Sequence, residues 1–252
     1  MTDEQFVRPS RLLWHAEGPR ALGELAQFWA AFPLLALGRR GDGHAVLTVP
    51  GFVADDASLR PLRTLLSVLG YEPMPWALGR NLGPSRRVLD GMSARLAQAF
   101  HESGRPVSIV GQSLGGIYAR GLARKHPEMV RGVITLGSPF RLDPSADNRD
   151  RTNTGDLYAA TSVWHDRDAL RRAALSAGAP LTVPATAIYT RTDGVVPWRS
   201  CLEPDGPFSE SVEVIGSHAG LGHHVRAVSV MLDRLAQPEG GWQPYQRAGQ
   251  AA

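Results

Sequence analysis

The sequence has little of three things that small proteins often use for stability or partner binding: cysteine, lysine and long hydrophobic runs. Its single cysteine, Cys201, excludes an internal disulfide and any zinc site built from cysteine pairs. The chain has 252 residues, of which 43% are hydrophobic, so it is long enough to build a substantial core by packing alone. Its composition lies near the globular average, which argues against a disordered, collagen-like or repeat protein.

Positive charge is present, but it lacks the pattern of a nucleic-acid-binding protein. The formal net charge is +3, and Lys125 is the only lysine among 27 basic residues. The arginines are scattered along the chain and do not form a stripe that would follow a phosphate backbone. We therefore expect no nucleic-acid partner.

No hydrophobic run is long enough to cross a membrane. The longest, 28–38, has about half of the ~20 residues that a transmembrane helix needs, and Pro33 interrupts it. The first ten residues lack the apolar stretch of a secretory signal. We therefore expect a cytoplasmic protein without a transmembrane segment. The apolar side chains of 28–37 leave peripheral contact with a membrane surface open, and a buried helix would explain the same side chains.

From residue 45 onward, short apolar runs alternate with amphipathic segments, which predicts a mostly parallel sheet with helices on both faces. The expected strands are 45–49, 71–76, 107–110, 130–136, 186–189 and 212–215. The expected helices are 59–69, 85–101, 115–126 and 223–235. We expect one α/β domain at 45–236, a helical lead-in at 1–44 and a loose tail at 237–252.

One long stretch breaks the alternation of strands and helices. Residues 141–184 are polar at first and then show helical patterns near 156–164 and 167–177. Segments of this length inside a compact domain often form caps or lids over a binding site. We expect an inserted cap here, and a surface excursion with two solvated helices is the alternative.

A candidate nucleophile lies at the centre of the sequence GQSLG at 111–115, which matches G-x-S-x-G. The motif follows the expected strand 107–110 and opens a helix, which is the strand–turn–helix setting of a nucleophile elbow. So tight a turn strains the backbone of the serine, and the flanking glycines let strand and helix pass closely. The turn also lifts the hydroxyl to a helix N-terminus, which favours a developing anion. We therefore predict that Ser113 is a nucleophile.

An activated serine needs a base and a carboxylate that orients the base, and both have candidates downstream. Asp193 follows the expected strand 186–189, at the edge of the sheet where ligand-facing loops lie. His218 lies in a loop of small residues directly after the last expected strand. The alternative acids are Asp166 and Asp168 in the insertion and Asp205 on a proline- and glycine-rich loop. The alternative bases are His223 and His224 at the start of the closing helix.

The chain order serine, aspartate, histidine is that of the α/β-hydrolases. Residues 45–236 resemble the α/β-hydrolase superfamily and look most like its bacterial serine esterase and lipase branch. Three stretches carry the resemblance: VPGF at 49–52, the elbow, and GSHAGL at 216–221, which is similar to the catalytic-histidine loop of small bacterial lipases. In such enzymes the loop after the first core strand usually reads His-Gly, whereas Pro50-Gly51 stands here.

This resemblance implies a carboxylic ester hydrolase that acts through a Ser113–His218–Asp193 triad and an acyl-enzyme, with no metal or organic cofactor. It also implies an oxyanion hole made by the backbone N–H groups of Phe52 and Leu114. Aromatic candidates for the wall of an acyl pocket are Phe140, Trp164 and Trp198. An acyltransferase with the same triad, or a non-catalytic ligand-binding protein on this scaffold, remains the alternative. The expected partner is a small-molecule or lipid ester, while chain length, leaving group and oligomeric state stay open.

Overall fold

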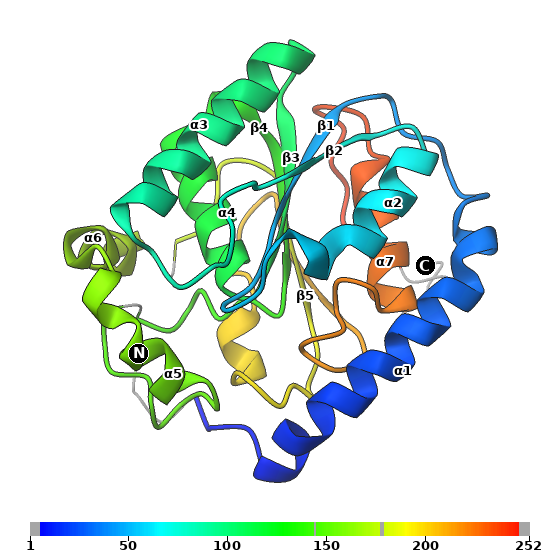
Figure 1. The fold of residues 1–252 in the computed structure, drawn as a ribbon. Helices are drawn as coiled ribbons and strands as arrows, with labels where there is room; N and C mark the ends of the chain where they lie inside the picture. The colour runs from blue at the N-terminus through cyan, green and yellow to red at the C-terminus, as the bar shows by residue number, and fades with distance from the viewer. Residues whose placement is uncertain (1–5, 144, 177–178, 247–252) are drawn as a thin grey trace.

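A computed structural model describes residues 6–143, 145–176 and 179–246 of the chain. In this part the chain forms a six-stranded sheet whose neighbouring strands are all parallel, in the order β2-β1-β3-β4-β5-β6 (Figure 1). The strands are β1 (Ala45–Val49), β2 (Glu72–Pro75), β3 (Val107–Gln112), β4 (Val130–Leu136), β5 (Ala185–Tyr189) and β6 (Ser209–Glu213).

Helices cover both faces of the sheet. The α-helices are α1 (Arg11–Leu35), α2 (Arg60–Val68), α3 (Arg86–Ser103), α4 (Leu114–Lys125), α5 (Gly155–Ala160), α6 (Arg167–Ser176) and α7 (Val225–Leu235). Short 3₁₀ turns are η2 (Asp56–Leu59), η3 (Pro127–Met129), η4 (Ser162–Trp164) and η5 (Trp198–Cys201). In Figure 1, α3 and α4 lie on one side of the sheet, while α1, α2 and α7 lie on the other.

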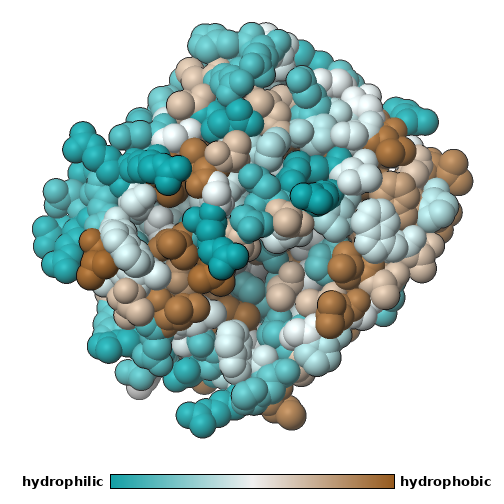
Figure 2. Space-filling model, viewed as in Figure 1, coloured by the Kyte–Doolittle hydropathy of each residue, from teal (hydrophilic) through white to brown (hydrophobic). Residues whose placement is uncertain are grey.

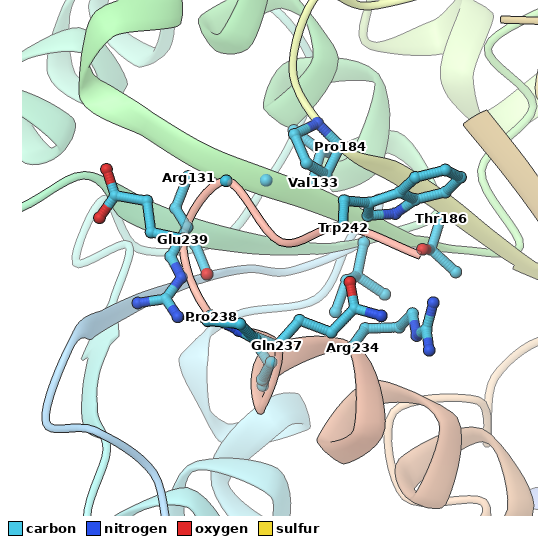
Figure 3. A pocket seen from close by; sticks show the side chains of 14 residues that line it. Arg131, Val133, Pro184, Thr186, Arg234, Gln237, Pro238, Glu239 and Trp242 are labelled. Atoms are coloured by element: carbon cyan, nitrogen blue, oxygen red, sulfur yellow. Dashed lines mark hydrogen bonds between the residues drawn. The ribbon is translucent and has the colours of Figure 1, made fainter. Parts of the chain in front are cut away.

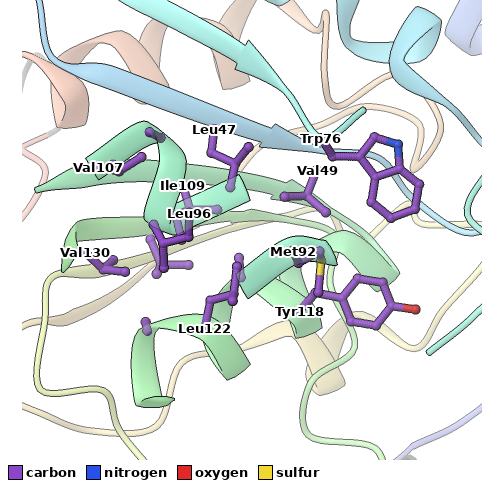
Figure 4. Close-up of a cluster of buried hydrophobic side chains, with 14 of the residues drawn as sticks. Leu47, Val49, Trp76, Met92, Leu96, Val107, Ile109, Tyr118, Leu122 and Val130 are labelled. Carbon is purple, nitrogen blue, oxygen red and sulfur yellow. The ribbon is translucent and has the colours of Figure 1, made fainter. Parts of the chain in front are cut away.

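The sheet's hydrophobic side chains alternate between two cores, because successive residues of a strand point to opposite faces. Leu47 and Val49 of β1 pack with α3 and α4, in the cluster drawn in Figure 4. Val46, between them in the sequence, packs on the opposite face with α2 and α7. Apolar side chains on both faces explain why these strands read as continuous hydrophobic runs.

The helix α1 packs in the core on the α2–α7 face of the sheet, which bears on the expected membrane contact through 28–37. Phe28 has no exposed surface and packs against the cluster formed by α2, α7 and the sheet. It therefore cannot contact a membrane from this position, although the sequence made it a candidate. Trp29, Leu34 and Leu37 remain partly or largely exposed on this side, and hydrophobic surface is visible along α1 in Figure 2. Within the described residues, no helix combines the length and the apolar character that crossing a membrane requires.

The last strand begins three residues earlier and ends two residues earlier than expected. The apolar run predicted a strand at 212–215, whereas β6 spans Ser209–Glu213 and pairs with β5. β6 ends the strand order, so it has a sheet neighbour on only one side. Because an edge strand tolerates polar residues, the first half of β6 carries no hydrophobic signal.

The tail after α7 is held in place as far as the structure describes it. Arg131 donates to the backbone oxygen of Gln237 at 2.6 Å, and the Tyr245 N–H donates to Glu210 at 2.6 Å. Trp242 and the neighbouring tail residues cover a small cavity of about 50 Å³ near the amino ends of β4 and β5 (Figure 3). Hydrogen bonds thus hold the described part of the tail against the fold, although most of its residues are exposed, and 247–252 lie outside the described residues.

The long insertion between β4 and β5 contains α5, η4 and α6, close to the two helical patterns expected there. Residue 177, at the end of the second pattern, lies outside the described residues. The Asp166 N–H donates to the Pro84 carbonyl at 2.8 Å, and the His165 ring bonds the Leu82 carbonyl at 3.1 Å. These contacts join the insertion to the loop before α3, on the α3–α4 side of the sheet.

Candidate active site

Ser113 occupies the sharp turn between β3 and α4. Its backbone adopts φ 51° and ψ −121°, a conformation that residues with a side chain rarely adopt. The turn needs glycine on both sides of the serine. A Cβ at Gly111 would overlap the backbone of Gly115, and a Cβ at Gly115 would overlap the backbone of Val49. The strained turn predicted from the motif is therefore present at Ser113.

Asp193 and His218 meet at the carboxyl edge of the sheet, in the loops after β5 and β6. The His218 Nδ1 lies 2.7 Å from the Asp193 Oδ2, and both residues are buried. The other carboxylate oxygen, Oδ1, accepts from the N–H groups of Val195 at 2.7 Å and Val196 at 2.8 Å. Both oxygens of Asp193 are thus engaged, and the one that faces His218 has a fixed direction.

The electrostatics of this pair favour a protonated imidazole. Burial lowers the pKa of His218, but the charge of Asp193, its hydrogen bond and the charge of Glu17 outweigh the burial. The net result is a His218 pKa above its ordinary value. The Asp193 contact at Nδ1 leaves Nε2 as the ring nitrogen available to a substrate or nucleophile.

The loop that carries His218 is bonded to the elbow. The Gln112 side chain donates to the backbone oxygens of His218 at 3.2 Å and Ala219 at 3.1 Å. Among the described residues, no hydrogen bond joins the Ser113 hydroxyl to His218. In the absence of substrate such bonds are often long and tighten only in the reacting complex. Gln112 was part of the predicted motif, but its role in joining the two loops was not predicted.

Two backbone N–H groups beside Ser113 have no acceptor within the described residues. They belong to Phe52, in the loop after β1, and to Leu114, the first residue of α4. Phe52, Ser113 and Leu114 all line one cavity. Next to Phe52, Val53 adopts φ 58°, so the backbone of this loop is also held in an unusual conformation. Free donors beside the serine are what an oxyanion hole requires.

A buried asparagine that the sequence did not suggest holds this loop. Asn81 has no exposed surface, and its side chain donates to the Pro50 carbonyl at 2.9 Å. The Asn81 backbone accepts from the Val53 N–H at 2.7 Å and donates to the Ala54 carbonyl at 2.8 Å. Its side-chain oxygen accepts from the Tyr118 hydroxyl at 3.3 Å. Asn81 thereby fixes residues on both sides of Phe52.

The cavity in front of Ser113 is large, about 1290 Å³, and lies between the elbow and the insertion. Around the serine, its apolar wall consists of Phe52, Leu114, Ile117, Tyr118, Phe140, Tyr158 and Val196. Arginine side chains, among them Arg120, Arg124 and Arg167, line other parts of the cavity. In Figure 2, hydrophobic surface is visible beside α5.

The predicted aromatic wall residues do not all reach this cavity. Phe140 lines it, whereas Trp164 is 60% exposed on η4, and Trp198 stacks on Tyr189 with ring centroids 5.6 Å apart. Trp164 and Trp198 are absent from its described lining. Tyr158 lines the cavity and contacts the ring of Phe52 with centroids 5.2 Å apart, although its local sequence pattern does not indicate a wall residue.

The alternative acids and bases have other contacts. His224 caps α7 by accepting from the Ala227 N–H at 3.3 Å, and His223 bonds the Ala21 carbonyl at 3.0 Å. Asp166 caps α6, while Asp205 is exposed. Of the candidates named from the sequence, the structure pairs only Asp193 and His218 with each other.

Structural comparison identifies the fold. No protein-family model matches the chain, and no curated protein matches it in sequence. Among solved structures, Aspergillus fumigatus lipase B is similar with a TM-score of 0.59 and 14% identity, over 79% of this chain and 54% of that chain. Bacillus licheniformis lipase BlEst2 is similar with a TM-score of 0.56 and 14% identity, over 79% of this chain and 95% of that chain. Paleococcus ferrophilus monoacylglycerol lipase is similar with a TM-score of 0.52 and 15% identity, over 78% of this chain and 96% of that chain.

The chain has the α/β-hydrolase fold. The fold class predicted from the sequence is therefore confirmed. The match extends over only about half of the length of the Aspergillus lipase, whereas it takes in nearly all of the Bacillus lipase.

The helix α1 also contacts the candidate active site, which was not predicted from the sequence. The side chains of Glu17, Arg20 and Glu24 on α1 form hydrogen bonds with the loops that contain Asp193 and His218. These charged residues stand at helical spacing on one side of α1, which is a signal that the sequence does contain.

Among the described residues, no group of three histidine, cysteine, aspartate or glutamate side chains is arranged to hold a metal ion.

Proposed function

We propose that this protein is a serine hydrolase that cleaves carboxylic esters through an acyl-enzyme on Ser113. The observation that carries the proposal is the meeting of three features at one edge of the sheet. A serine on a strained elbow faces a large cavity, two free N–H donors flank the serine, and a buried aspartate–histidine pair lies in the loop bonded to the elbow. A protein that only binds a ligand would not need these three features together.

In the proposed mechanism, the Ser113 Oγ attacks the carbonyl carbon of the ester while the His218 Nε2 takes the hydroxyl proton. The negative charge that develops on the carbonyl oxygen accepts hydrogen bonds from the N–H groups of Phe52 and Leu114. When the intermediate collapses, His218 gives the proton to the leaving alcohol. Water then attacks the acyl-enzyme by the same steps and releases the acid.

Asp193 contributes by orienting the base and by stabilising its charged form. Its Oδ2 accepts from the His218 Nδ1–H at 2.7 Å, so the ring keeps Nε2 free to accept a proton. When His218 becomes an imidazolium, the buried carboxylate is the nearest opposite charge. This arrangement supplies the base that a serine hydroxyl needs.

The cavity supports an ester with an apolar acyl group. Apolar and aromatic side chains surround Ser113, and the cavity is larger than a short acyl group needs. Three of the similar structures are named as lipases, which favours the same class of substrate.

A panel of nitrophenyl esters from acetate to dodecanoate tests the proposal. We expect the wild type to hydrolyse members of this panel and Ser113→Ala to lose the activity while it keeps the wild-type thermal unfolding temperature. No hydrolysis of any ester by the folded wild type, or retained activity in Ser113→Ala, would contradict the proposal. Added alcohols that capture the acyl group in preference to water would indicate an acyltransferase.

A further inference from the structure

The helix α1 precedes the α/β domain in the sequence, yet it contacts the loops of the acid and the base. In Figure 1, α1 runs alongside α7, on the side of the sheet opposite to α3 and α4. Glu17 and Glu24 on this helix are 5% and 8% exposed, and neither touches the substrate cavity. A buried carboxylate is costly unless its oxygens accept hydrogen bonds, so these two require an explanation.

Glu17 bridges the two loops with a single carboxylate. Its Oε1 accepts from the Gly194 N–H at 2.8 Å, and its Oε2 accepts from the Ala219 N–H at 3.0 Å. Gly194 directly follows Asp193, and Ala219 directly follows His218. One side chain therefore joins the backbone positions next to the acid and next to the base.

The loops approach α1 so closely that the contact leaves no room for a larger residue. A Cβ at Gly194 would overlap the backbone of Leu13 in the first turn of α1. A Cβ at Gly220, two residues after the base, would overlap the carboxylate of Glu24. The small residues of both loops are thus matched to the helix that lies against them.

Two further side chains of α1 hold the flanks of the same loops. Arg20 donates to the backbone oxygen and the hydroxyl of Thr192, both at 3.0 Å, and also to the Gly216 carbonyl. Glu24 accepts from the Ser217 N–H at 2.7 Å and from its hydroxyl at 2.5 Å. Residues immediately before and after both Asp193 and His218 are therefore bonded to one helix.

We propose that Glu17 is a positioning residue that fixes Asp193 against His218 by bridging their loops, which makes α1 part of the active site. The inference rests on the proposed function, because it assigns Glu17 a role in the activity of that pair. Glu17 acts through the backbone of the loops and does not touch the substrate. No covalent bond keeps the Asp193 and His218 side chains 2.7 Å apart, because their loops follow separate strands. The hydrogen bonds of the Glu17 carboxylate hold the two loops together.

The charge of Glu17 gives the proposal a signature that a structural role alone would not produce. Glu17 acts on His218 as a second anion beside Asp193 and helps to raise the pKa of the imidazole. Among the described residues, the other charged or titratable groups on the surrounding elements are Arg20 and Glu24 of α1, Cys201 of η5, and His223 and His224 before α7. Removal of the Glu17 charge alone should lower the pKa of His218.

The test compares Glu17→Gln with the wild type and with Glu102→Gln, which removes a carboxylate from the exposed surface of α3. The amide of a glutamine at position 17 can accept a hydrogen bond from only one of the Gly194 and Ala219 N–H groups, because its NH₂ group then faces the other. We expect kcat/KM on the best nitrophenyl ester to fall roughly 10- to 100-fold in Glu17→Gln. We also expect the His218 pKa, followed by NMR of ¹⁵N-labelled histidine, to move to lower pH. Glu102→Gln should match the wild type in both measurements.

A folded Glu17→Gln with wild-type kcat/KM and an unchanged His218 pKa would overturn the proposal. If that variant does not fold, Glu17→Asp tests the same claim, because it keeps the charge but is one methylene too short to bridge both loops. We expect lower activity with a His218 pKa closer to that of the wild type. If neither variant folds, Glu17 stabilises the fold and the positioning role is overturned.

The same measurements separate this proposal from the proposed function. If the wild type hydrolyses no ester, the function is wrong, and the histidine titration still shows whether Glu17 controls His218. If the wild type is active and neither kcat/KM nor the His218 titration responds to Glu17→Gln, only the role of Glu17 is wrong.

Discussion

The two sides of the candidate active site are built differently. On one side, Asp193 and His218 are 3% and 6% exposed, and hydrogen bonds from α1 and from their own loops hold them. On the other side, the insertion over the cavity exposes Leu157 to 50% and Val163 to 78%. Backbone N–H groups of Arg141, Asn153 and Asp166 still join it to Ser200, Val195 and Pro84.

This difference separates chemistry from substrate selection. Proton transfer depends on sub-ångström placement, so the acid and the base need a rigid environment. The exposed part of the insertion around Leu157 and Val163, called the roof below, can change its sequence without moving those groups. Substitutions on the rigid side should therefore change the rate for every ester, and substitutions in the roof should change the preference among esters.

The largest effect is expected at the acid itself. In Asp193→Asn, the amide favours the wrong tautomer of His218 and no longer stabilises the imidazolium, so kcat should fall by about 10⁴-fold, as for the analogous change in a serine protease. The loss should be similar for short and long esters, and circular dichroism should show a native fold. Near-normal activity would mean that the acid is misassigned and that Asp166 or Asp205 should be tested.

The next effect is the dependence of the rate on pH. Neutral His218 is the active base, so the rate rises as pH increases through its pKa. That pKa lies above the ordinary value of 6.5, because the charge and hydrogen bond of Asp193 and the charge of Glu17 outweigh burial. We expect kcat/KM for an uncharged ester to fall about tenfold per pH unit below this pKa. A midpoint well below the ordinary value would show that the pair is not held as described.

Asn81 tests whether the rigid side extends to the loop of Phe52. In Asn81→Ala, the Pro50 carbonyl and the Tyr118 hydroxyl lose a buried partner, which should cost about 1–3 kcal/mol of unfolding free energy. We also expect kcat to fall roughly tenfold with little change in KM, because the oxyanion donor shifts. Urea unfolding and steady-state kinetics measure the two effects. An unchanged kcat in the folded variant would remove Asn81 from the support of this loop.

The smallest effect on rate, and the largest on selectivity, is expected in the roof. Tyr158 lines the cavity and contacts Phe52, so Tyr158→Ala should widen the space for the acyl group. We expect the ratio of kcat/KM between long and short nitrophenyl esters to change several-fold, with little change for the acetate.

The neighbouring residue provides the control for this change. Leu157 is exposed and is absent from the described lining of the cavity, so Leu157→Ala should keep the wild-type preference. The same preference in Tyr158→Ala and in the wild type would show that the insertion is a surface excursion and not a selective roof.

The sequence predicted the features whose signal is local. The sheet follows from apolar runs that alternate with helices, and the elbow follows from a motif that begins at the end of a strand. Asp193 and His218 could be selected because loops after parallel strands meet at one edge of a sheet. The shifted position of β6 shows the limit, because a polar edge strand has no hydrophobic run to mark its start.

The contacts between distant parts of the chain could not be predicted in this way. Glu17 bonds Gly194 and Ala219, which lie 177 and 202 positions away. Nothing in the local pattern says that α1 folds against these loops and not against another face. The same limit applies to the cavity wall. The sequence predicts Trp164 and Trp198 as wall residues and does not indicate Tyr158, because large aromatic side chains occur in cores, on surfaces and in cavities alike.

Covalent labelling of Ser113 tests the central claim most directly. A fluorophosphonate places its phosphoryl oxygen where the oxyanion would form and accepts the serine oxygen at phosphorus. Mass spectrometry should find one label per chain, on the peptide that contains Ser113, and ester hydrolysis should fall in step with labelling. Labelling should be much slower in His218→Ala, nearly unchanged in His223→Ala and absent in Ser113→Ala. A folded wild type that resists the probe, or that carries the label on Ser108, Ser138 or Ser217, would contradict the account at its first chemical step.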